Sequence, residues 1–180
     1  MLDAQESKII DDTKAWIRQV VIGQQLCPFA HDVFSRLAVV VESTNVVDQL
    51  ALAFAEELTR LLNAGPVVRP TSVLVLTELG RSFDDYLDIA EYLNDCLVVL
   101  ELSGEFQIAT FHPDYQFEGS EAEDPANWTN RSPWPMFHIL RTADVASARE
   151  AHPDIDSIPA RNIEHFRALG LETVRRLTDQ

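Results

Sequence analysis

Two kinds of hydrophobic spacing alternate along the chain and predict helices and strands in turn. Apolar side chains recur every three or four residues from about Gln5 to Gln24, which predicts an amphipathic helix with one face against a core. The same spacing predicts a second helix that ends at about Asn63. Asn45 is placed to cap the first turn of this helix. Three later segments are also expected to be helical. The first begins after Ser82, the second is short and lies near Val145–Ala151, and the third begins at about Pro159 and is weakened by Gly170.

Four short runs rich in apolar and β-branched residues predict strands. They are 36–43 (RLAVVVES), 71–78 (TSVLVLTE), 105–112 (EFQIATFH) and 135–141 (PMFHILR). No helix is expected between the last two runs, so these two strands should pair antiparallel. The order of elements predicts an α+β or mixed α/β fold, with one sheet of about four strands and a long ordered loop between the last two. A chain of 180 residues suits a single domain spanning 1–180.

The charge balance narrows the classes of partner. The chain carries 29 acidic and 14 basic residues, a formal net charge of -15. Nucleic acids and anionic membranes both attract clustered Lys and Arg, so neither is an expected partner. No apolar run approaches the roughly 20 residues that cross a bilayer, and the acidic start does not resemble a secretory signal. A cytoplasmic protein is expected, and the sequence leaves its oligomeric state open.

The loop between the last two predicted strands is the most unusual segment. It is longer than the roughly 12 to 15 residues usual for loops in compact domains, which favours a functional role. Trp128 and Trp134 favour an ordered lid or wall, because such rings are costly to leave in water. His112 and His138 lie at its two ends. Since side chains alternate along strands, the pairing could place both histidines on the same side of the sheet.

Several residue types in these segments carry chemistry. Cys27 lies in a Pro-stiffened turn, where a thiolate could act as a nucleophile or a soft metal ligand. His112 or His138 could be its base, if either imidazole lies within about 3 Å. Planar guanidinium groups suit a carboxylate or phosphate. The candidate substrate-binding residues are Asn130, Arg131, Arg141, Arg161 and Asn162. The GxGxxG, GxxxxGK[ST], HExxH and CxxC motifs are absent from the sequence.

Four blocks of the sequence, "LCPFA", "FHPDYQF", "NRSPWPMFHILR" and "IPARN", occur in this order. Together they resemble the signature blocks of an uncharacterised, mainly bacterial family, the domain of unknown function 1415. The resemblance spans nearly the whole chain. It implies that the candidate residues, all of which fall in these blocks, form one site, and it implies no particular reaction.

Three functions remain open at this point. The first is a small-molecule enzyme whose Cys, His and Arg side chains act on a polar or anionic substrate. The second is a metal-binding protein in which Cys27, His112 and His138 hold zinc or another transition metal, with water as a fourth ligand. The third is a non-catalytic binding or scaffold protein, in which the histidines pin the long loop and the acidic surface recruits a basic partner.

Overall fold

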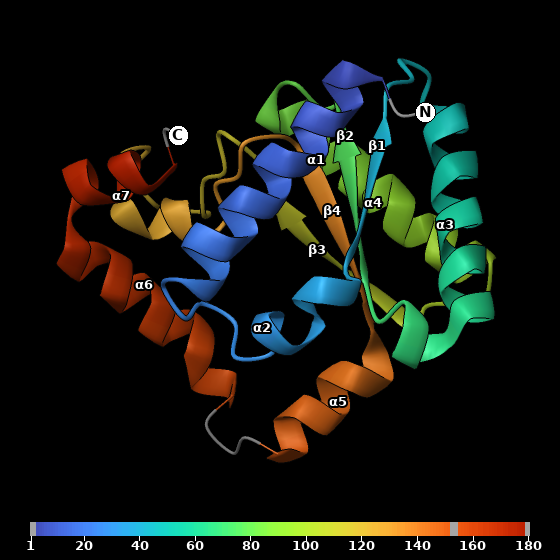
Figure 1. Ribbon diagram of the computed structural model, residues 1–180. Coiled ribbons are helices and arrows are strands. Elements are labelled where there is room, and N and C mark those ends of the chain that lie inside the picture. Colours follow the sequence, from blue (N-terminus) through green and yellow to red (C-terminus); the bar gives the residue numbers. More distant parts are fainter. Residues whose placement is uncertain (1–2, 152–154, 179–180) are drawn as a thin grey trace.

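The computed structural model describes residues 3–151 and 155–178, and its strands form one four-stranded sheet (Figure 1). The strands are β1 (Ala38–Glu42), β2 (Ser72–Leu76), β3 (Phe106–Phe111) and β4 (Met136–Arg141), in the spatial order β1-β2-β4-β3. β1 and β2 are parallel, and β4 is antiparallel to both of its neighbours. The predicted α+β fold and the antiparallel pairing of the last two strands are therefore confirmed.

Helices connect and cover the strands. They are α1 (Ala4–Trp16) with a π-helical extension η1 (Ile17–Ile22), α2 (Ala30–Val33) with a 3₁₀ turn η2 (Phe34–Arg36), α3 (Val47–Val68), α4 (Phe83–Val99), a 3₁₀ turn η3 (Pro125–Thr129), α5 (Thr142–Ala151), η4 (Ile155–Ser157), α6 (Ile158–Leu169) and α7 (Leu171–Thr178). Within the described ranges, no helix is both long and apolar enough to cross a bilayer.

Local signals set some of these helix ends. Ser82 caps α4 as predicted, because its hydroxyl accepts the Asp85 N–H at 3.1 Å. Asn45 does not cap α3; that helix begins after Val46 without a side-chain cap. Gly170 adopts a φ of 78° and separates α6 from α7. The glycine therefore breaks the last predicted helix into two.

The order of the strands explains which face each helix covers. The steps from β1 to β2 and from β2 to β3 run in the same direction across the sheet. Because such crossovers are right-handed, α3 and α4 must lie on the same face of the sheet. α1, α6 and α7 lie on the opposite face (Figure 1). The chain then returns along β4, which fills the place between β2 and β3.

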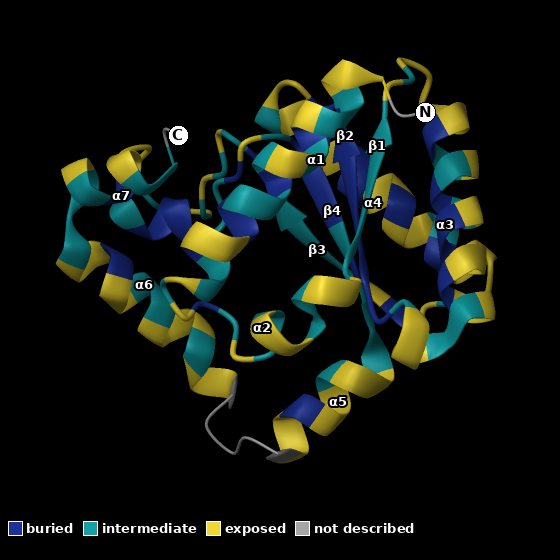
Figure 2. Cartoon of the chain, in the orientation of Figure 1, coloured by how far each residue is buried: buried dark blue, intermediate teal, exposed yellow. Residues whose placement is uncertain are grey.

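Side-chain alternation along β2 and β4 divides the apolar residues into two cores. Leu74 and Phe137 belong to the core under α3 and α4, whereas Val73, Val75 and Met136 belong to the core under α1. Both strands are buried by elements on their two faces (Figure 2). A side chain's position along β4 therefore decides which of two separate environments it enters.

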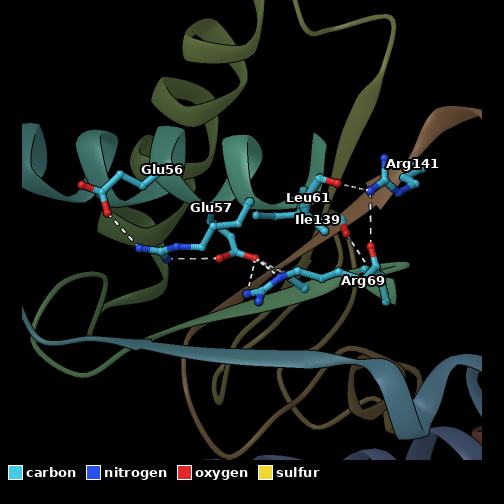
Figure 3. A network of polar contacts seen from close by, with 9 residues as sticks. Glu56, Glu57, Leu61, Arg69, Ile139 and Arg141 are labelled. Atoms are coloured by element: carbon cyan, nitrogen blue, oxygen red, sulfur yellow. Dashed lines mark hydrogen bonds and ion pairs between the residues drawn. The ribbon is translucent and has the colours of Figure 1, made fainter. Parts of the chain in front are cut away.

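A buried polar network fastens α3 to the sheet (Figure 3). The carboxylate of Glu57 is fully buried, and it accepts hydrogen bonds from Arg69 Nε at 2.8 Å and from the Ser72 hydroxyl. Arg141, the last residue of β4, donates through Nη2 to the carbonyls of Leu61 and Arg69. Removing one partner of a buried ion pair costs about 3–5 kcal/mol, so this network fixes the end of α3 against β2 and β4.

Candidate functional site

A cavity of about 320 Å³ lies on the α1 face of the sheet. Most of the side chains around it are apolar and come from the sheet, from α1 and η1, from the α2 segment and from α5. They include Trp16, Val33, Phe34, Ala109, Met136 and Leu140. The side chains with polar groups that border the cavity are Cys27, Thr71, His138, Arg141 and Asp144. The cavity thus combines apolar walls with a few polar groups, as small-molecule sites do.

His138 enters this cavity from β4, and its ring is held by one neighbour. Its Nε2 lies 2.7 Å from the Thr71 hydroxyl oxygen, which itself lies 2.6 Å from the carbonyl oxygen of Ile139. Nδ1 has no hydrogen-bond partner among the described residues, and it is not among the buried atoms that lack a partner. The imidazole therefore has one nitrogen fixed by the protein and one available to a ligand.

The surroundings keep this imidazole uncharged. Burial lowers the pKa of His138 from 6.5 to about 4. The residue is half-buried, and it borders a cavity whose apolar walls solvate an imidazolium poorly. At neutral pH His138 is therefore a neutral group that offers a lone pair.

Cys27 borders the same cavity from the turn between η1 and α2. Its thiol is free and half-buried. Asn162 of α6 holds the turn, because its Nδ2 donates to the carbonyl of Leu26 at 2.8 Å. The predicted thiol and one of the two predicted imidazoles are thus brought to one cavity by segments more than a hundred residues apart.

The prediction that both histidines lie on the same side of the sheet is wrong. In the β3–β4 register, Ala109 pairs with His138, so these two residues share the cavity face. His112 follows Ala109 by three positions, and an odd offset directs its side chain to the other face. His112 accordingly packs on the α4 side, against Tyr86 and Phe83, and does not border the cavity.

Both ring nitrogens of His112 are used inside the protein. Nδ1 accepts the backbone N–H of Asp114 at 2.9 Å, so the ring proton sits on Nε2, which donates to the carbonyl of Gly80 at 2.9 Å. The side chain is fully buried, and desolvation lowers its pKa below the usual value. The backbone of His112 also pairs with Asn130 and Ser132. These contacts fasten the start of the long loop to the α4 side of the sheet.

The candidate binding residues of the loop are also occupied by the loop itself. Asn130 Nδ2 donates to the carbonyl of Thr110 at 3.2 Å. Arg131 donates to the carbonyls of Tyr115 and Ala122, and its guanidinium lies 3.8 Å from the centre of the Trp128 ring. These side chains therefore hold the loop in place by donating to backbone carbonyls of the loop and of β3. Neither Asn130 nor Arg131 borders the cavity.

The last two candidates lie elsewhere. Arg161 and Asn162 border a separate polar hollow of about 420 Å³ at the start of α6, together with Gln24 and His165. The predicted residues are therefore distributed over the cavity, the loop and this hollow. Within residues 3–151 and 155–178, no group of three or more His, Cys, Asp or Glu side chains is arranged to hold a metal. The proposed three-ligand set fails because His112 lies on the opposite face.

Sequence reasoning missed two polar residues of the cavity and one of the loop. Thr71 and Asp144 border the cavity. Asn127 is fully buried and organises the loop by bonding the backbone of Phe117 and Glu121. Thr71 acts on His138 across 67 positions of sequence, so no local pattern announces it. For Asn127, the signal was an amide residue among the buried aromatic residues of a long loop.

The contacts of His112 predict a structural role for this residue. His112→Ala should lower the free energy of unfolding by about 3 kcal/mol, because it leaves a void and two unpaired backbone groups. His31→Ala is the matched control, since His31 is exposed on α2, and it should change stability by less than about 0.5 kcal/mol. Urea denaturation measures both values. Equal stabilities of the two variants would contradict the role assigned to His112.

Comparison with known proteins agrees with the resemblance noted in the sequence. No curated protein and no solved structure matches the chain significantly. One family model matches residues 8–176 and is described as a protein of unknown function, DUF1415. This match includes every candidate residue discussed above and all four strands. The chain therefore belongs to the DUF1415 family.

Proposed function

We propose that this protein binds a small, mainly apolar molecule in the cavity under α1, with the molecule's polar group against His138. The observation that carries the proposal is that His138 borders a cavity with apolar walls and that its Nδ1 has no hydrogen-bond partner among the described residues. The volume of about 320 Å³ falls at the lower end of the range for small-molecule sites. The first expectation, a polar or anionic substrate, fits these walls less well.

Packing supports a binding role over a purely structural one. Apolar side chains that face water are stabilised when an apolar molecule covers them. Several aromatic and aliphatic side chains of the α2 segment remain half-exposed around the cavity, among them Val33 and Phe34. A bound apolar molecule would remove this apolar surface from water.

Binding of an uncharged, environment-sensitive dye with an N–H group, such as N-phenyl-1-naphthylamine, tests the proposal. The protein should bind the dye, and Ala109→Phe should weaken binding by about tenfold because the larger ring fills the cavity from β3. Ala146→Phe is the matched control, since Ala146 is exposed on α5 and does not border the cavity. Circular dichroism checks that both variants fold. No dye binding, or equal weakening by the two variants, would refute the proposal.

Catalysis by Cys27 is a second candidate, favoured by the presence of a free thiol and a neutral imidazole on one cavity. In this version the thiol gives its proton to Nδ1 of His138, and the thiolate adds to a carbonyl carbon of the bound molecule. The π electrons of that C=O bond move to its oxygen, which takes the proton back from Nδ1. The first candidate needs only binding, whereas this one needs the two groups to approach within hydrogen-bonding reach during the reaction.

Alkylation by N-phenylmaleimide, followed by mass spectrometry, distinguishes the two candidates. Catalytic competence predicts that Cys27 reacts about tenfold faster than Cys96, and that His138→Gln removes this advantage. Cys96 is the internal control, because it is also free and half-buried, and burial raises its pKa. If Cys27 and Cys96 react at similar rates, and His138→Gln changes neither rate, the catalytic candidate fails.

A further inference from the structure

The Thr71 hydroxyl has one proton and two close neighbours, which decides how it bonds. Its oxygen lies 2.6 Å from the carbonyl oxygen of Ile139 and 2.7 Å from Nε2 of His138. A carbonyl oxygen only accepts hydrogen bonds, so the hydroxyl proton must point to Ile139. The Thr71 oxygen then has only lone pairs for His138. Nε2 of His138 must therefore carry the ring proton and donate it to Thr71.

This arrangement fixes the tautomer of His138. Thr71 is 4% exposed, and its partner Ile139 lies in β4, next to His138 itself, so the three groups are held by the sheet. The other tautomer would set the lone pair of Nε2 against the lone pairs of the Thr71 oxygen. Leaving a buried polar group unpaired costs about 1–3 kcal/mol, which keeps the proton on Nε2. Nδ1 consequently offers a lone pair and no proton.

Arg141 is a charged donor at the end of β4, and the other polar groups bordering the cavity add little capacity to donate. Asp144 is exposed at α5 and has only acceptor oxygens when ionised. Arg141 directs Nη2 to the carbonyls of Leu61 and Arg69, on the side of α3, and its Nε is buried without a hydrogen-bond partner among the described residues. The Cys27 thiol is a weak donor. Protonation does not change the role of His138 at neutral pH, because burial holds its pKa near 4.

We infer that the cavity selects uncharged apolar molecules that carry a hydrogen-bond donor, such as a hydroxyl or N–H group, and that Thr71 is the positioning residue that sets this selectivity. The inference rests on the proposed binding function and adds the chemical class of the ligand. A ligand hydroxyl donates to Nδ1 of His138. An ether or ketone of the same shape has no proton to donate, so the lone pairs of its oxygen would face the lone pair of Nδ1 and repel it. A site built to bond a hydroxyl rejects analogues that lack it, since its own polar atom is then left unpaired.

Displacement of N-phenyl-1-naphthylamine by four related probes tests the selectivity. The probes are 1-naphthol, naphthalene, 1-methoxynaphthalene and 1-naphthoate, which share one ring system and differ in the polar group. We expect 1-naphthol to bind about tenfold more tightly than naphthalene or 1-methoxynaphthalene. Equal binding of 1-naphthol and 1-methoxynaphthalene would overturn the inference while leaving the proposed function intact. Tightest binding of 1-naphthoate would overturn it in favour of anion recognition, and displacement by no probe would contradict the proposed function as well.

Substitution of Thr71 separates positioning from simple structural support. Thr71→Val preserves the side-chain shape and frees the tautomer, so the preference for 1-naphthol over naphthalene should fall to about threefold or less, with naphthalene affinity unchanged. Thr71→Ser retains the hydroxyl and should restore the preference. Thr59→Val is the matched control, because Thr59 is exposed on α3 and its hydroxyl bonds the Ala55 carbonyl within the same helix. An unchanged preference in Thr71→Val would overturn the role of Thr71, as would an equal loss of affinity for both probes.

Discussion

The site depends on the pleat of one strand, β4, which lies between β2 and β3. Successive side chains of this strand point to opposite faces of the sheet. Phe137 and Ile139 therefore pack under α3 and α4, while Met136 and His138 face α1. A shift of one residue would move His138 into the α3–α4 core and remove it from the cavity. The hydrogen bonds of Arg141 to the end of α3 fasten the strand in this register.

The same alternation gives the two histidines different tasks. His112 uses both ring nitrogens to join the long loop to the chain around Gly80, and it is fully buried. His138 uses one nitrogen for Thr71 and leaves the other to the cavity. Because the loop is held by His112 and by the carbonyls that Arg131 bonds, its polar residues stabilise a wall. The chemistry of the cavity then falls to His138 and Cys27.

Patterns within a single segment were predictable, and relations between distant segments were not. The strands, most helices and the Ser82 cap could be predicted, because each depends on the spacing of apolar or capping residues within one short segment. Cys27 and His138 border the same cavity because of how β3, β4 and η1 pack together. The register between two strands depends on both strands, so it cannot be predicted from the sequence of either one. The odd offset between Ala109 and His112 in that alignment is what made the same-face prediction wrong.

Nitrogen-15 NMR of the imidazole rings in uniformly labelled protein tests most directly whether Nδ1 of His138 is an unprotonated acceptor for the ligand. At neutral pH, His138 should give the shifts of a neutral ring protonated at Nε2, and a ligand that donates a hydrogen bond, such as 1-naphthol, should move its Nδ1 signal. The signals of His112 should stay in place, because both of its nitrogens are bonded within the protein. A charged or Nδ1-protonated His138, or a ligand that shifts His112 instead, would contradict the account.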